Sequence, residues 1–229
     1  MADKNWADFY DYCLPYANDA PKPVAVLHIR SACKEFLETT TALRSIFDTI
    51  TPAASTAEYA MTFASQGIGS SGQYQALSFV PKSVKIGSNP MFEITEDELD
   101  QRVYDWRSST AGADASHFFL TWDRAMRIYP YPNSDYTGTS TITGECYINI
   151  TEAATGVLDS IYNQYKEYIG YGAAERLLRM PNQRWSDIQS AEYFHLKFKR
   201  GMSKAKAVLT RGRTEKPAGV RPVDSFLIA

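Results

Sequence analysis

The residues that could carry out chemistry in this sequence are few and scattered. Its three histidines, His28, His117 and His195, lie far apart along the 229 residues. A metal site or a Ser-His-Asp arrangement would have to be assembled from these side chains. His195 falls beside the apolar stripe of a predicted helix, which favours a structural role for it. The motifs G-x-S-x-G, C-x-x-C and H-E-x-x-H do not occur. We therefore predict no catalytic residue, no metal and no cofactor.

Carboxylates gather in one short stretch, at Glu93, Glu96, Asp97, Glu98 and Asp100. Such a run could perform general acid–base catalysis or hold a hard cation. The competing interpretation is the first turn of a helix, where the backbone dipole favours negative charge. The segment Thr95 to Glu98 fits a capping box, which favours this second interpretation. A cell-wall hydrolase that uses these acids is kept as a minor alternative.

Three glycines, Gly67, Gly69 and Gly72, have the spacing of a dinucleotide fingerprint. That motif requires a helix directly after the glycines, so that the phosphates meet the helix N-terminus. Here the residues from Gln73 to Val80 alternate like a strand instead. We interpret the glycines as a hairpin tip.

Basic residues concentrate at the C-terminal end. Residues 197–229 carry nine lysines and arginines against two acids, a charge of +7, and this leaves −9 for residues 1–196. A basic helix end followed by a basic tail could bind phosphate groups or an acidic protein surface, or could simply complement the helix dipole. We predict contacts to a partner, as a hypothesis, for Lys204, Lys206, Arg211, Arg213, Lys216, Arg221 and Phe226.

The composition fits an ordinary globular protein, with 44% hydrophobic and 22% charged residues, and so excludes disorder of the whole chain. No apolar run approaches the roughly 18 residues that a membrane span needs, and the first residues show no apolar signal core. Cys13, Cys33 and Cys146 lack zinc-site spacing and are expected to be free thiols.

Hydrophobic periodicity predicts three long helices, over residues 24–41, 151–180 and 186–211, and a short helix after Thr95. A second capping box, Ser186 to Gln189, marks the start of the last long helix. Short strands are predicted over 43–51, 58–64 and 74–80. The best alternation, in two halves between residues 113 and 150, predicts one long antiparallel hairpin.

These elements predict an α+β fold, a small helical bundle that carries an inserted antiparallel β subdomain. We expect an extended N-terminal arm over 1–23, a bundle built from 24–42 and 151–213, the insert over 43–150 and an extended tail over 214–229. Small residues on the third helix, at Gly170, Gly172, Ala173 and Ala174, are expected to let another backbone approach closely.

Residues 169–205 carry a recognisable pattern. A small-residue stretch, Gly172-Ala-Ala174, is followed by Arg176-Leu-Leu-Arg-Met-Pro181 and by Trp185-Ser186. Ala191, Tyr193, Phe194 and Gly201 then fall at helical spacing, and Ala205 closes the pattern. This segment resembles the C-terminal half of phage head-to-tail adaptor (connector) proteins. The first helix, with Arg30, Ala32, Phe36 and Leu37, is similar to the first helix of that family.

The resemblance implies a structural virion protein with an adaptor-like bundle and no enzymatic activity. Such adaptors form a ring of twelve copies beneath the portal, around the channel through which genomic DNA passes. Their bundle and C-terminal tail engage the portal protein, and other surfaces receive tail or nozzle proteins. The expected location is the head–tail junction of the virion, after synthesis in the host cytoplasm. The insert is larger than in the shorter members of the family, and contact with the tail or with neighbouring copies is our interpretation of it.

One further alternative follows from the basic end of the chain. The segment could contact the DNA backbone directly, as part of a channel or a packaging or completion protein.

Overall fold

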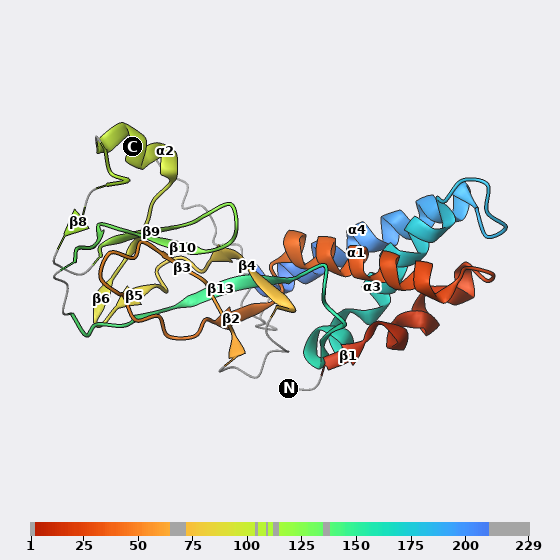
Figure 1. The fold of residues 1–229 in the computed structure, drawn as a ribbon. Coiled ribbons are helices and arrows are strands. Elements are labelled where there is room, and N and C mark those ends of the chain that lie inside the picture. Colours follow the sequence, from red (N-terminus) through yellow and green to blue (C-terminus); the bar gives the residue numbers. More distant parts are fainter. Residues whose placement is uncertain are drawn as a thin grey trace, which may run out of the picture.

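The computed structural model describes residues 3–64, 72–103, 105–108, 110–111, 115–134 and 138–210. The fold is α+β, as predicted, and is elongated, with a helical bundle at one end and a β-rich insert at the other (Figure 1). No helix of the described chain is both long and apolar enough to cross a membrane.

Three long helices form the bundle: α1 (Lys22–Thr40), α3 (Asp159–Leu178) and α4 (Ile188–Thr210). α3 packs against both α1 and α4, so helices from the two ends of the sequence bury their apolar stripes on each other. Phe36 of α1 lies between Tyr165 of α3 and Phe198 of α4, with ring centroids 4.9 and 6.5 Å away. The bundle core is therefore largely aromatic.

The N-terminal arm is folded rather than extended, which corrects part of the prediction. It contains β1 (Asp3–Asn5) and two 3₁₀ helices, η1 (Trp6–Tyr12) and η2 (Leu14–Tyr16). The aromatic residues hold it on the bundle, because Trp6 donates its indole N–H to the carbonyl of Ala154 at 2.8 Å and Phe9 is fully buried. The prolines that suggested an extended segment are compatible with 3₁₀ turns.

Two helix starts differ from the prediction. α3 begins at Asp159 instead of residue 151, because Gly156–Leu158 form strand β14, which pairs antiparallel with β1. α4 begins at Ile188, and its cap is Asp187, whose carboxylate accepts hydrogen bonds from the backbone N–H groups of Gln189 and Ser190 at 3.0 and 3.2 Å. The expected capping box from Ser186 was therefore one residue early. The other box is confirmed, since Thr95 and Glu98 bond reciprocally at the start of α2 (Glu96–Arg102).

The insert consists of short strands in several small sheets. β2 (Arg44–Ile46), β13 (Glu145–Ile150) and β4 (Tyr74–Phe79) form a three-stranded sheet beside the bundle. A four-stranded sheet has the order β3 (Glu58–Tyr59), β10 (Met126–Tyr129), β9 (His117–Leu120), β7 (Phe92–Glu93). Another three-stranded sheet has the order β12 (Ile142–Thr143), β5 (Lys85–Ile86), β6 (Asn89–Pro90). A two-stranded sheet joins β11 (Tyr131–Pro132) and β8 (Thr110–Ala111).

The predicted long hairpin between residues 113 and 150 is wrong. β9 and β10 pair with each other through a tight turn in which Thr121 and Ala125 exchange hydrogen bonds. β3 and β7 then occupy the outer edges of that pair, so no edge is left for β13. β13 pairs instead with β2 and β4, and its buried face continues the bundle core into the insert.

Candidate functional site

The small residues of α3 lie at contacts within the chain. A Cβ atom on Gly170 would stand 2.7 Å from the carbonyl oxygen of Tyr12, in the arm. A Cβ atom on Gly172 would stand 2.9 Å from the ring of Phe198, on α4. Ala173 and Ala174 are fully buried. The backbone that approaches α3 most closely at Gly170 is thus the chain's own arm.

Most residues of the pattern that resembles adaptor proteins pack in the interface between α3 and α4. Ala191, Phe194, Gly201 and Ala205 lie on the buried face of α4, and Leu177 is buried on α3. Among the residues of the pattern on α4, Tyr193 is the exception, because 55% of it is exposed on the outer face of the helix.

The outer face of α4 combines cations with apolar side chains. Arg200, Lys204 and Lys206 are exposed and form no ion pair with any residue that the structure describes. Lys199 lies 3.5 Å from Glu35, and Lys197 lies over the ring of Tyr193. Sequence reasoning identified these cations but not the apolar residues between them. The other predicted contact residues, Arg211, Arg213, Lys216, Arg221 and Phe226, fall outside the described part of the chain, as does the predicted tail over 214–229.

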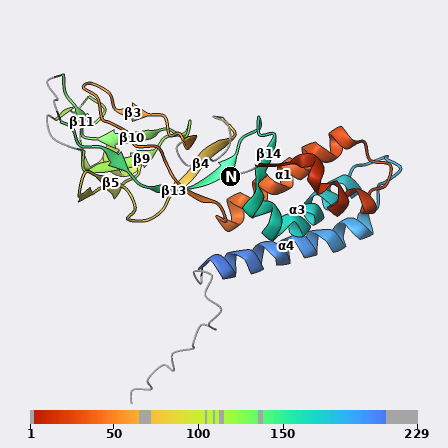
Figure 2. The same cartoon turned by 90° about the horizontal axis from the view of Figure 1, so that it is seen from below.

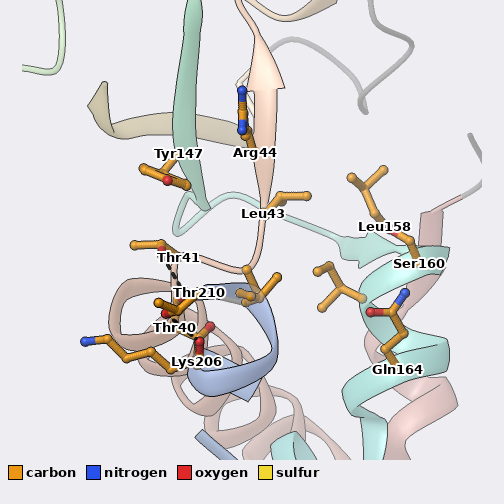
Figure 3. Close-up of a pocket in the computed structure, with 13 residues that line it drawn as sticks. Thr40, Thr41, Leu43, Arg44, Tyr147, Leu158, Ser160, Gln164, Lys206 and Thr210 are labelled. Carbon is orange, nitrogen blue, oxygen red and sulfur yellow. Dashed lines mark hydrogen bonds between the residues drawn. The ribbon is translucent and has the colours of Figure 1, made fainter. Parts of the chain in front are cut away.

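A cavity of about 510 Å³ separates the end of α4 from the insert (Figure 3). Its walls come from α1, β2, β13, α3 and α4, and Figure 3 shows Lys206 and Thr210 on one side and Ser160 and Gln164 on the other. Hydroxyl and amide groups alternate there with apolar side chains such as Leu43. The lining offers hydrogen bonds and apolar contact, but no histidine, cysteine or carboxylate.

Three of the carboxylates around α2, those of Glu96, Glu98 and Asp100, pair with arginines of the insert. Asp100 accepts hydrogen bonds from Arg107 at 2.5 Å and from the indole N–H of Trp106 at 2.7 Å, and these bonds hold the pKa of its carboxyl below the ordinary value. The backbone N–H of Thr95 does the same for the pKa of Glu98. Both acids are therefore stabilised as charged, structural groups.

A second cavity, of about 540 Å³, lies between α2 and the four-stranded sheet, beside Glu93. Burial raises the pKa of the Glu93 carboxyl. No group of three or more potential metal ligands occurs within the described ranges.

The histidines have ordinary surroundings. The Nδ1 atom of His195 lies 3.0 Å from the carboxylate of Glu175, which also pairs with Arg179 at 3.2 Å. Burial, with a contribution from Arg176, lowers the pKa of His28. The structure does not bring the three histidines together, because His117 lies on β9 in the insert.

A groove on the N-terminal arm was missed from the sequence. This arm groove, about 600 Å³, has an apolar lining with two aspartates and an asparagine: Tyr10, Leu14, Pro15, Ala20, Asp11, Asp19 and Asn18. Both aspartates are exposed and neither pairs with a described cation. The signal was present, since residues 3–19 hold four aspartates and one lysine, but the 3₁₀ turns that bring Asp11 and Asp19 together were not predicted.

Neither a family model nor a curated protein matches the chain.

Proposed function

We propose that this chain is a ring-forming head-to-tail adaptor, which joins the portal to the tail of a phage virion around the DNA channel. The observation that carries the proposal is the construction of α4. Its inner face holds most of the pattern shared with adaptors, and its outer face presents cations and apolar side chains to a partner. An exposed helix face of this kind is typical of protein interfaces, where Tyr and Arg are enriched.

The fold supports this role in a second way. The bundle is sealed by aromatic packing and by the close approach at Gly170, and it holds the outer face of α4 on a rigid support. The insert projects from the opposite end of the molecule (Figure 1). One end of the protomer is thus available to the portal and to neighbouring copies, and the other to tail or nozzle proteins.

Binding to the DNA backbone is the second candidate, and it is favoured by Arg200, Lys204 and Lys206, which form no ion pair within the described part of the chain. The exposed side chains of Tyr193 and Leu196 favour a protein partner instead, because phosphate contacts need no apolar surface. A virion location at the head–tail junction belongs to the first candidate.

The test is to co-express the full chain with the portal protein of the same genome and to measure the mass of the purified complex. An adaptor should give a complex with twelve copies of this chain on the portal ring. A chain that stays monomeric with the portal, and that binds duplex DNA with an affinity falling steeply with salt, would contradict the adaptor function and favour DNA binding.

A further inference from the structure

Two surfaces of the bundle have complementary chemistry. The outer face of α4, opposite its buried stripe, displays Tyr193 and Leu196, which are 55% and 56% exposed, beside Arg200 and Lys204, which form no ion pair with a described residue. Its 23 residues make the face about 34 Å long. Burying these two large apolar side chains beside two cations suits an anionic, partly apolar surface.

The arm groove has that opposite chemistry. Tyr10, Leu14 and Pro15 give it apolar surface, and the ammonium group of Lys22 lies 5.9 Å from the centre of the Tyr10 ring. Asp11 and Asp19 give it negative charge, and neither forms an ion pair with a described residue. If a partner covers the groove, the two aspartates lose water, and this desolvation costs free energy unless the partner supplies positive charge. The groove is therefore matched to an apolar surface that brings its own lysine or arginine.

The two surfaces lie on opposite sides of one protomer. Figure 1 shows α4 along the upper side of the bundle and the arm along its lower side, with α1 and α3 between them. In Figure 2, which is seen from below, the arm overlaps α1 and α3, and α4 runs along one side of the bundle. The arm contacts α4 at Tyr16, whose ring lies 4.4 Å from that of the buried Phe194. A protomer cannot bring the outer face of its own α4 into its own groove, so the groove is open to a second copy.

We infer that the outer face of α4 of one copy docks in the arm groove of the next copy. The contact is heterologous, because two different patches meet, and repetition of such a contact produces a closed ring when the rotation closes. The inference rests on the proposed function and names the surfaces by which the ring forms. Arg200 and Lys204 face Asp11 and Asp19 across the contact, which sets its orientation and its salt dependence.

Two double variants test the contact by reversing its charges. The arm variant carries Asp11→Lys and Asp19→Lys, and the helix variant carries Arg200→Glu and Lys204→Glu. Each alone places like charges on both sides of every contact, so assembly on the portal ring should weaken by about 100-fold or more at moderate salt. In a 1:1 mixture, arm and helix variants pair with opposite charges at every contact when they alternate. The mixture should therefore assemble again, with the two variants in equal numbers.

The control is a third double variant, Lys82→Glu with Lys85→Glu, which reverses two exposed cations of the insert. It should assemble like the wild type. Circular dichroism and thermal melting check that every variant is folded, as expected for exposed positions. Assembly is followed by native mass spectrometry of the full-length chains.

The outcomes separate this inference from the proposed function. If the wild type forms rings and the arm and helix variants do so equally well, the docking surfaces are wrong and the adaptor function stands. If only the helix variant fails and the mixture is not rescued, α4 meets something other than the arm groove, which also overturns the inference. If the wild type does not assemble at all, alone or on portal rings, both proposals fail.

Discussion

The insert and the outer face of α4 use their charged residues differently. In the insert, Arg107 pairs with Glu96 at 2.8 Å and with Asp100 at 2.5 Å, and Arg127 pairs with Glu58 at 2.7 Å. On the outer surface of the bundle, Arg200 and Lys204 have no such partner among the described residues. Exposed ion pairs contribute little to the stability of the fold. A side chain that is already paired within the chain is nevertheless less available to a partner of opposite charge. Several charges of the insert are thus paired within it, whereas Arg200 and Lys204 on the outer face of α4 are left for a partner.

This difference changes how the charge distribution is interpreted. Residues 1–196 carry a net charge of −9, and residues 197–229 carry +7. The count alone suggests one acidic body opposite one basic end. In the structure, many of the negative charges are held by neighbouring arginines in the insert. The aspartates of the arm groove are the acidic groups placed to receive cations from another copy. The following predictions test this comparison, from the largest expected effect to the smallest.

The two faces of α4 should respond differently to truncation. Phe198→Ala removes a buried ring that contacts α1 and α3, and should lower the free energy of unfolding by about 3 to 5 kcal/mol. Leu196→Ala, on the exposed face, should change it by less than about 1 kcal/mol while weakening assembly. Chemical denaturation of the isolated chains measures both. A large loss of stability in Leu196→Ala would show that the outer face is packed within the chain.

Alanine at Gly170 should destabilise the bundle, although alanine is normally the better helix residue by about 1 kcal/mol. The new methyl group would stand 2.7 Å from the carbonyl oxygen of Tyr12, so the arm must move, at a cost of about 1 to 3 kcal/mol. Glu167→Ala, at an exposed position of the same helix, is the matched control and should be neutral or stabilising. Denaturation midpoints that rise for Gly170→Ala would contradict the close packing of the arm.

The rates at which the cysteines react should show whether the insert opens locally more often than the bundle. All three cysteines are buried, and burial raises the pKa of Cys13 and Cys146 to about 12. Reaction with a disulfide reagent therefore requires opening of the structure. The strands of the insert span two to six residues, so we expect Cys146 to react about tenfold faster than Cys13 or Cys33. Peptide mass spectrometry measures each rate, and equal rates would mean that both regions open together.

The internal pairing of the insert should give a small pH dependence. The pKa of Asp100 is lowered by hydrogen bonds from Arg107 and Trp106, so its contribution to stability is present above its ordinary pKa of 3.8. That contribution is lost as the pH falls through the lower pKa of the folded state. Asp100→Asn should therefore melt below the wild type at pH 7, and the difference should shrink below about pH 4. A difference at pH 3 as large as the difference at pH 7 would contradict this origin.

Local patterns predicted much of the fold, and long-range pairing limited the rest. The three long helices follow from apolar periodicity, and the box at Thr95 follows from its spacing. The arrangement of β13 could not be read from alternation, because which strand edges are free depends on turns such as the one at Thr121. The arm groove was missed for a related reason. Asp11 and Asp19 come together only through two 3₁₀ helices, whose signal in the sequence was masked by the prolines.

The most direct test of the head-to-tail contact is a cross-link between its two surfaces. The full chain with Asn18→Cys in the arm groove and Lys204→Cys on α4 should form intermolecular disulfides on mild oxidation, while the native cysteines stay buried. Under denaturing, non-reducing electrophoresis we predict a ladder of linked chains for the double variant, and none for either single variant. Dimers alone from the Lys204→Cys chain, or no ladder from the double variant, would contradict the account.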